Sequence, residues 1–278
     1  MQWYSYVHAG TATIRVILYY VTLLVDPSLR SSKGNEFFLG FNGNTKGTTS
    51  KSAAVILVTT DDLVPVNFEV EYFDSEPEKY KAVSGRTTMV KLPIGRHGEP
   101  GDVRVTNKKQ RNRAVRVKAE GNSSLTVYGI NDVDESTDAF LALPCHQYDN
   151  VTNYAYFVFS TAVQGSTMTN QHQSQILIVS CKSNTSVTVI PNKTITLIPG
   201  DLTGTGTIPR PIKYRSPVKD VNTGEFTINR LQTVQFKSTE DLTGTIIVSN
   251  KPISVFVCLL YTSPSPRDAT LSRMPSSA

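Results

Sequence analysis

The chain has 278 residues, of which 39% are hydrophobic, so it can form one large folded domain or two of ordinary size. Its formal net charge of +5 is only mildly basic. Without a clustered basic face in a recognisable nucleic-acid-binding fold, nucleic acid is excluded as the expected partner. The three cysteines include no Cys-x-x-Cys pair, which excludes a zinc site of the usual spacing.

An apolar run, residues 16–25, lies near the N-terminus between Arg15 and Asp26. It is too short to span a bilayer, and no other stretch could do so, but its length suits the apolar region of a signal peptide. We therefore predict a signal peptide and leader over residues 1–33, and a secreted protein. A buried strand, or an upstream extension of the reading frame, would explain the same run.

From Gly34 onward, short runs of β-forming residues are separated by turn residues, and no period of 3.6 is evident. Val115 and Val117 alternate with Arg116 and Lys118, which predicts one buried and one wet face, as in antiparallel sheets. Many short strands of this kind are typical of an all-β sandwich. The expected strands are 54–59, 66–73, 87–92, 114–118, 125–130, 155–160, 175–180, 186–190, 194–198, 233–236, 245–248 and 253–257.

The two halves of the chain resemble each other. The runs 56–58 and 66–68 recur as 177–179 and 187–189 at one constant spacing along the chain. A repeat of about 120 residues predicts two tandem, similar antiparallel β-sandwich-like units, which we place at 34–145 and 146–257. A propeller-like repeat arrangement is the alternative fold, and a chance likeness of strand patterns would give the same matches.

Residues 258–278 differ from the rest because they are rich in Ser, Pro and Arg and show no strand pattern. They interrupt the expected strand 253–257 and resemble the translation of a sequencing-library adaptor. We therefore expect a non-native tail, a truncated second unit, and further modules in the native chain. An ordinary disordered tail is the alternative.

Enzyme signatures are absent from the sequence, including G-x-S-x-G, the P-loop, the dinucleotide fingerprint and H-E-x-x-H. The segment 131–138 gathers carboxylates, but Thr137 and Leu143 occupy the positions where an EF-hand needs Gly and Glu. A solvated acidic loop is therefore preferred to a calcium site. We expect no catalytic residue, no cofactor and no metal.

Three sets of residues are candidates for other chemistry. Cys145 and Cys181 could form a disulfide, which would stabilise by roughly 3–4 kcal/mol. Asn-x-Ser/Thr sequons favour a secretory route, and a run of cations could grip sulfate or sialate groups, unless it is only a solubilising hairpin. The glycosylation candidates are Asn122, Asn150, Asn184 and Asn192, and the possible anionic-ligand patch is Lys108, Lys109, Arg111, Arg113, Arg116 and Lys118.

The segment 241–257 (DLTGTIIVSNKPISVFV) resembles the signature of the N-terminal domain of the IgG Fc-binding protein family. Stretches at 34–41, 114–128 and 139–154 are similar to the same family and follow its order. The resemblance thus runs from about residue 34 to 257. It implies a secreted protein of mucus or epithelial surfaces, in which this domain accompanies cysteine-rich von Willebrand-type or EGF-like modules. No residue here can be matched to an Fc contact.

These features together predict a non-catalytic, secreted, mucus- or matrix-associated binding or adhesion module. Its ligand would be an extracellular protein or a glycan. A structural spacer within a larger extracellular protein is one alternative. The other is an accessory domain of a carbohydrate-active enzyme, which would need two converging carboxylates, with Asp132, Asp134 and Asp138 as candidates.

Overall fold

The computed structural model shows a chain built from β-strands. Besides the backbone of three short strands nearer the N-terminus, it describes residues 31–42, 53–73, 75–94, 102–105, 113–133, 136–145, 151–160, 174–191, 198–202, 224–238 and 241–259. Helices are missing from these residues, and none of the described segments could therefore cross a membrane as a helix.

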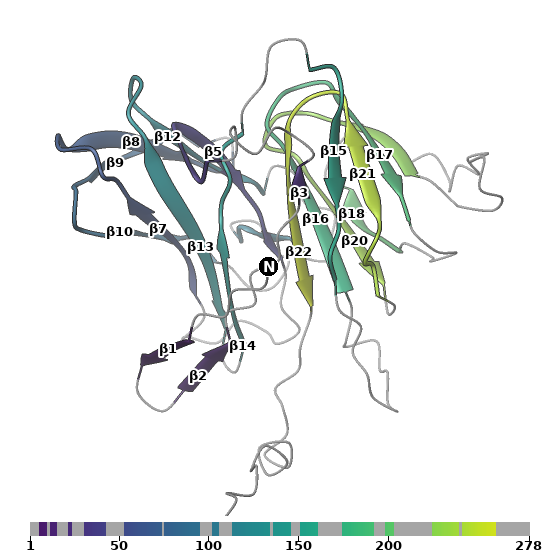
Figure 1. Cartoon of the computed structure of the whole chain (residues 1–278), viewed down its shortest axis with the longest axis horizontal. Helices are drawn as coiled ribbons and strands as arrows, with labels where there is room; N and C mark the ends of the chain where they lie inside the picture. The colour runs from purple at the N-terminus through teal and green to yellow at the C-terminus, as the bar shows by residue number, and fades with distance from the viewer. Residues whose placement is uncertain are drawn as a thin grey trace, which may run out of the picture.

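The first sandwich packs two antiparallel sheets around one core (Figure 1). The sheet orders are β10-β7-β13-β14, with β4 also paired to β13, and β5-β12-β8-β9. Its core contains Phe37, Ile56, Phe68 and Val117. The strands are β4 (Lys33–Gly34), β5 (Glu36–Leu39), β7 (Ala53–Thr59), β8 (Val66–Glu71), β9 (Glu78–Ala82), β10 (Thr88–Leu92), β12 (Val115–Ala119), β13 (Leu125–Val133) and β14 (Ser136–Leu141).

The second sandwich also has two antiparallel sheets and a separate core. The sheet orders are β19-β17-β21-β15-β3 and β18-β20-β16-β22. Its core contains Ile176, Ile178, Val187 and Ile247. The strands are β3 (Thr22–Leu23), β15 (Tyr154–Phe157), β16 (Ser174–Ser180), β17 (Thr185–Ile190), β18 (Ile198–Leu202), β19 (Gly224–Ile228), β20 (Thr233–Ser238), β21 (Ile246–Ser249) and β22 (Ile253–Leu259).

Two further pairings lie outside these sheets. Strand β6 (Phe41–Asn42) pairs in parallel with β11 (Arg104–Val105), and β1 (Tyr6–Ala9) forms a hairpin with β2 (Ala12–Arg15).

Seven strands of each sandwich share one topology, and only the outlying strands β4, β14, β3 and β18 differ. This arrangement confirms the prediction of two similar sandwich-like units rather than a propeller. β7 lies between β10 and β13, and β16 lies in the same way between β20 and β22. β8 lies between β12 and β9, and β17 lies between β21 and β19. The outer neighbour of β12 is β5, and that of β21 is β15. Strands in corresponding places therefore follow one another in the same order along the chain.

The repeat differs in register from the constant spacing expected from the sequence. Ile56 and Val58 face the first core, but their expected counterparts Leu177 and Val179 face away from the second core. Because side chains alternate with a period of two, a one-residue shift exchanges the two faces of a strand. The connection between β16 and β17, residues 181–184, is shorter than the one between β7 and β8, residues 60–65. Val66 and Val187 both face their cores, so the constant spacing holds for β8 and β17 but not for β7 and β16.

Some strands lie where the sequence pattern did not predict them. The expected acidic loop 131–138 instead forms a hairpin, in which Asn131 on β13 pairs with Asp138 on β14. The run expected to be a signal peptide contains β3, whose backbone pairs with β15; the signal peptide itself stays a prediction. The expected strand 253–257 extends to Leu259, and residues 260–278 lie outside the described residues.

Candidate functional site

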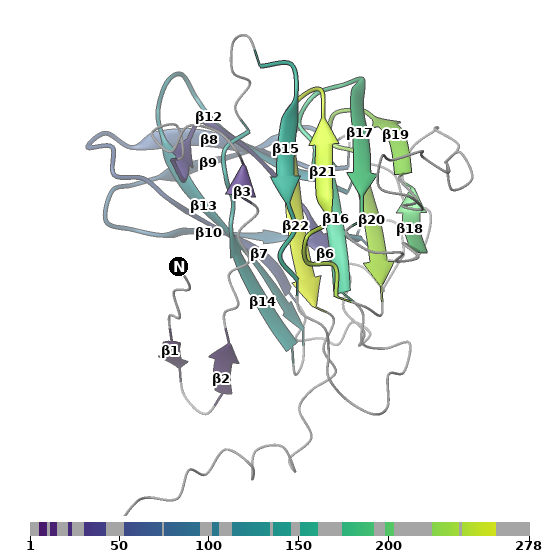
Figure 2. The ribbon, with the colours of Figure 1, turned by 45° about the vertical axis from the view of Figure 1, so that its right-hand side comes forward.

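The sheet that contains β16 and β22 lies beside the first sandwich (Figure 2). Strand β16 is buried along its whole length. Ile176 and Ile178 face the second core, whereas Leu177 and Val179 pack in a separate cluster with Phe38 of β5. A strand buried on both faces reads as a continuous apolar run, as 176–179 does. We call the contacts between the two sandwiches the junction.

Glycine allows the close approach at the junction. A Cβ atom added at Gly40 would lie 2.7 Å from Leu177 Cδ2 and 2.8 Å from Val179 Cγ2, closer than packed carbon atoms can approach. Nearby, the ring of Phe140 lies over Gly129 and 4.8 Å from the ring of Phe256, measured between centroids. The edge strands β5 and β14 of the first sandwich thus contact the outer face of the sheet that contains β16 and β22.

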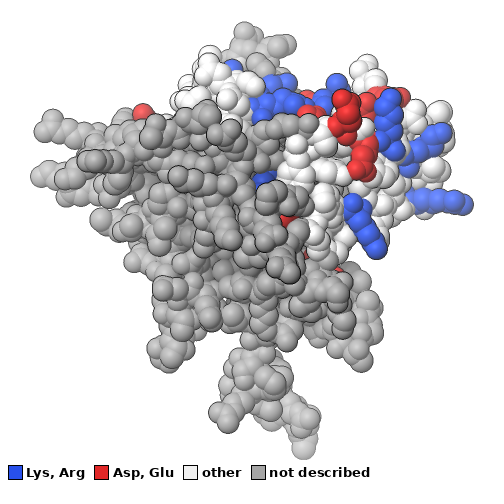
Figure 3. Space-filling view, turned by 180° about the vertical axis from the view of Figure 1, so that it is seen from behind, with Lys and Arg blue, Asp and Glu red and all other residues white. Residues whose placement is uncertain are grey.

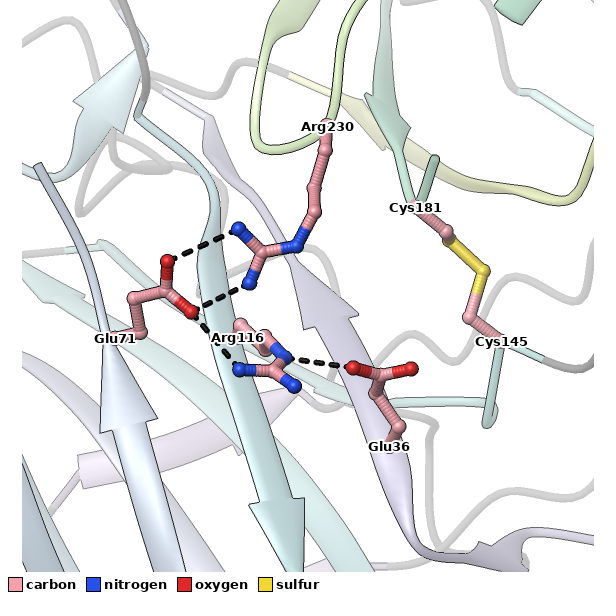
Figure 4. A network of polar contacts seen from close by, with 6 residues as sticks. All are labelled: Glu36, Glu71, Arg116, Cys145, Cys181 and Arg230. Atoms are coloured by element: carbon pink, nitrogen blue, oxygen red, sulfur yellow. Dashed lines mark hydrogen bonds and ion pairs between the residues drawn. A yellow bond between two sulfur atoms is a disulfide. The ribbon is translucent and has the colours of Figure 1, made fainter. Parts of the chain in front are cut away.

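A disulfide crosses the junction. Cys145, directly after the first sandwich, bonds to Cys181, at the end of β16, with their Cα atoms 6.4 Å apart (Figure 4). The Cys145 amide donates to the carbonyl of Glu36 on β5, which holds this end of the bridge against the first sandwich. Since Cys145 is held against the first sandwich and Cys181 follows a strand of the second, the bond restricts their relative movement.

An ion-pair network lies beside the disulfide (Figure 4). Arg116 on β12 donates from Nε to Glu36 at 2.6 Å and from Nη1 to Glu71 at 3.0 Å. Arg230, in the turn before β20, reaches Glu71 from the second sandwich at 3.0 and 2.5 Å. Burial by itself raises the pKa of Glu71, but the hydrogen bonds and charges of Arg230 and Arg116 outweigh it, so that pKa lies below its ordinary value.

Buried amides form a third link across the junction. The side-chain amide of Gln235 donates to Asn42 Oδ1 at 2.8 Å and to Gln175 Oε1 at 2.7 Å. Asn131 donates to the carbonyl oxygen of Asn42 at 2.8 Å. Buried polar groups of this kind favour one docking arrangement, because a shifted arrangement would leave them without partners.

The structure describes three of the six predicted anionic-ligand residues, and these three differ in burial and in their contacts. Arg113 is buried, and its guanidinium donates to the carbonyl oxygens of Asp102 and Arg104. Arg116 is engaged in the junction network, and Lys118 is exposed. The other three members, Lys108, Lys109 and Arg111, lie outside the described residues.

Lys118 belongs to the outer face of sheet β5-β12-β8-β9, which we call the charged face. Across this face, Lys118 lies between Glu36 and Glu69 in the strand register, and Glu69 lies next to Lys79. Charges of opposite sign therefore alternate across the strands, a pairing that stabilises a sheet. Figure 3, a view from behind, shows blue and red side chains interspersed in the described part of the surface.

Two of the four predicted glycosylation sites are described, and both lie in exposed turns. Asn122 lies in the turn between β12 and β13, and Asn184 in the turn between β16 and β17. Asn150 and Asn192 lie outside the described residues. Glycosylation at all four stays a prediction.

Among the carboxylates of the expected acidic loop, Asp132 and Asp138 do not converge, and Asp134 lies outside the described residues. Asp132 and Asp138 belong to adjacent cross-strand pairs of the β13–β14 hairpin, so their side chains leave opposite faces of it. Burial raises the pKa of Asp138 above its ordinary value. The Cys258 thiol donates a hydrogen bond to Asp138 at 3.3 Å, which offsets part of this rise. Within the described ranges, no group of three or more His, Cys, Asp or Glu residues could hold a metal ion.

An apolar surface on the first sandwich was not predicted from the sequence. The outer face of sheet β10-β7-β13-β14 carries Met89, Leu57, Tyr128 and Leu141 side by side in one cross-strand row. The next row carries Lys91, Val55, Ile130 and Ala139, and we call both rows together the apolar face, which Lys91 borders at β10. Met89 is 60% exposed and Tyr128 is 40% exposed. The signal was the continuous run 53–58, because a strand with one wet face would alternate.

Comparison with known proteins agrees with part of the resemblance seen in the sequence. Residues 138–271 match the model of a family described as IgGFc binding protein, which confirms the predicted resemblance. The matched residues include most of β14 and the described strands of the second sandwich from β15 to β22. No curated protein and no solved structure matches the chain.

Proposed function

Since residues 138–271 match the IgGFc binding protein family, we propose that this chain is a non-catalytic module of a secreted, mucus- or matrix-associated protein that binds an extracellular ligand. The observation that carries this proposal is the Cys145–Cys181 disulfide across the junction. Disulfides form and persist in oxidising compartments, and the bond here joins two sandwiches into one platform. Such a platform suits a module that presents ligand-binding surfaces outside the cell.

Two carboxylates with shifted pKa values, Glu71 and Glu78, fit a non-catalytic role. Glu71 owes its lowered pKa to the arginines of the junction, and Glu78 to hydrogen bonds from Tyr72 and Tyr80. Perturbed pKa values mark catalytic sites when their groups converge in a cleft, but ion-pair networks that stabilise the fold also produce them. Here both carboxylates have partners that belong to the fold.

The predicted anionic-ligand patch is part of the proposal in a reduced form. Lys118 is exposed at the end of β12, and the sequence places Lys108, Lys109 and Arg111 shortly before that strand. Sulfated or sialylated glycans of mucus are ligands that such cations could hold. Because exposed charges are screened by salt, this binding should weaken as the salt concentration rises.

Two probes test the proposed function directly. The chain, secreted from eukaryotic cells, is assayed by biolayer interferometry against IgG Fc and against an array of sulfated and sialylated glycans. We expect saturable binding to at least one probe. The triple variant K108S/K109S/R111S should reduce glycan binding at least about tenfold, the loss of about 1.4 kcal/mol of attraction.

A matched control separates the patch from general charge. The double variant K79S/K81S removes two lysines from strand β9, at the far side of the charged face, and should leave glycan binding unchanged. A chain that binds neither Fc nor any glycan contradicts the proposed function. That result would favour a structural spacer, because a junction held by a disulfide also suits that role.

The secretory route has its own test. We propose a signal peptide within residues 1–33, glycans on the four sequons, and a division of the chain into units 34–145 and 146–257. N-terminal sequencing of the secreted protein locates any cleavage, and a mass shift on enzymatic removal of N-glycans counts the modified sites. Retention inside the cell without glycans would contradict this route.

A further inference from the structure

The two sandwiches differ in what covers one corresponding sheet face. In the second sandwich, the row Gln235–Leu177–Phe256 crosses the outer face of sheet β18-β20-β16-β22. In the first, the row Met89–Leu57–Tyr128 crosses the outer face of the corresponding sheet. Leu177 is fully buried by the first sandwich, whereas Met89 and Tyr128 are open to solvent. The same type of surface is therefore covered once and exposed once.

The residues that cover this face in the junction come from the edge of a sandwich. On β5, Phe37 and Leu39 face the first core, and the intervening Phe38, with Gly40 beyond it, meets Leu177 and Val179. The edge strand thus contacts the sheet face with its outward-facing residues.

The corresponding part of the second sandwich, which we call its edge, is the end of β15 and the residues after it. The outermost strand β3 pairs with β15 at Tyr156 and Phe157, and the chain is exposed beyond that pairing. On β15 and the residue after it, Tyr156 and Val158 face the second core, so Phe159 lies on the outward side, as Phe38 and Gly40 do in the first sandwich. Phe159 is 48% exposed. Large aromatic side chains that are exposed to solvent often anchor protein–protein interfaces, and Phe159 is a side chain of this kind.

The turn Asp241–Thr245 holds Phe159 in place. The Val158 amide donates to the carbonyl of Thr245 at 2.9 Å, and the Ser160 amide donates to Thr243 Oγ1 at 2.9 Å. Asp241 in turn accepts a hydrogen bond from the Thr243 amide at 2.9 Å. Since the backbone on both sides of Phe159 is fixed, little conformational entropy would be lost when its ring binds a partner.

We propose that a second copy of this chain docks on the apolar face through the edge of its second sandwich, with Phe159 of one copy packed against Leu57 and Tyr128 of the next. The contact repeats between copies the arrangement that the junction makes within one chain. It joins two different surfaces, so a dimer keeps one face and one edge unused, and further copies add head to tail. This self-association does not depend on the extracellular ligand proposed above.

Sedimentation velocity at chain concentrations from about 1 to 200 µM tests the proposal, since weak protein contacts have dissociation constants in that range. We expect the sedimentation coefficient of the unmodified chain to rise with concentration. Tyr128→Lys, which blocks the apolar face, and Phe159→Lys, which blocks the edge, should each keep the chain monomeric. Leu63→Lys, at a residue that is 97% exposed in the turn between β7 and β8, is the control and should associate normally.

Mixing the two blocked variants gives the sharpest result. Tyr128→Lys keeps an intact edge and Phe159→Lys keeps an intact apolar face, so an equimolar mixture should form dimers and nothing larger. Met89→Lys serves as a second face variant if Tyr128→Lys lowers the melting temperature. A chain that stays monomeric at all concentrations overturns the proposal. So does association without dimers in the mixture, which would indicate a symmetric contact or another surface.

Discussion

Arg230 and Glu71 are 159 residues apart in the chain, yet both Nη atoms of the arginine donate to the one carboxylate, at 3.0 and 2.5 Å. The pair joins the turn before β20 to strand β8, and so the second sandwich to the first. The guanidinium of Arg230 also lies 5.8 Å from the centre of the Phe38 ring. One side chain therefore combines an ion pair and a cation–π contact at the junction.

Glu71→Gln should destabilise the chain at neutral pH by about 1–3 kcal/mol, because Arg230 and Arg116 lose the charge of their shared partner. The folded pKa of Glu71 lies below its ordinary value of 4.5, so folding favours the ionised form. This stabilisation is complete above that ordinary value and is lost as the pH falls through the lowered folded pKa. The measurement is urea unfolding of both proteins at a series of pH values.

The difference in unfolding free energy between the unmodified chain and Glu71→Gln should therefore shrink as the solution is acidified. Glu69→Gln is the control, because it removes a carboxylate from the same face of β8 without touching the ion pair with Arg230. A difference that does not change with pH would show that the charge of Glu71 does not stabilise the junction.

Cys145→Ser combined with Cys181→Ser should lower the free energy of unfolding by about 3–4 kcal/mol, the loop-closure entropy for a bridge of this span. The sequence separation of the two cysteines is 36 residues. Denaturant unfolding with and without a reductant measures the loss. The reductant should destabilise the unmodified chain and leave the double variant unchanged.

Alkylation under denaturing conditions counts the thiols independently. Of the three cysteines, only Cys258 takes no part in the disulfide, so one alkylation is expected before reduction and three after it. Three alkylations without reductant would contradict the disulfide.

The alternation of apolar and polar residues predicted the strands well, because a strand with one buried face repeats its apolar residues with a period of two. Val115, Arg116 and Val117 on β12 show the expected pattern of buried and partly exposed positions. The same reasoning failed for the segment 131–138, whose carboxylates suggested a loop, because the cross-strand pairing in the β13–β14 hairpin outweighs the low strand propensity of Asp. Propensity is weak wherever tertiary pairing opposes it.

The junction could be predicted only in part, since it joins residues far apart in the sequence. The disulfide candidate was visible because the chain has only three cysteines. The burial of Arg113 could not be predicted from the sequence. A charged residue within a run of cations gives no sign that it will be buried and will donate to backbone carbonyl oxygens. The continuous apolar run on β16 indicated burial of both faces but not which residues would cover them.

Gly40→Ala tests the close approach at the junction. The added methyl group would overlap the side chains of Leu177 and Val179, and overpacking of this kind costs typically about 1–3 kcal/mol. Combined with Leu177→Ala, which makes room for the methyl group, the total cost should be lower than the sum of the two single changes by about 1–2 kcal/mol. Gly40→Ala with Val189→Ala, in the second core, should instead be additive. Additivity in both pairs would contradict the contact.

Tyr72 and Tyr80 should ionise later than ordinary tyrosines, because burial, and then the hydrogen bonds to Glu78 and its charge, raise the pKa of each to about 12. A folded pKa above the unfolded value of 10.0 means that this stabilisation is present below pH 10 and is lost as the pH rises through the folded pKa. Tyrosinate absorbance, titrated for the unmodified chain and for Tyr72→Phe, gives the curve of Tyr72 by difference. Glu78→Gln should move that curve toward lower pH but not fully to the ordinary value, since burial remains. A titration curve of Tyr72 that already lies at the ordinary pKa would show that Glu78 does not bind its phenol group. Strand β9, which carries Glu78, would then be held to the sandwich by its backbone pairing and core contacts alone.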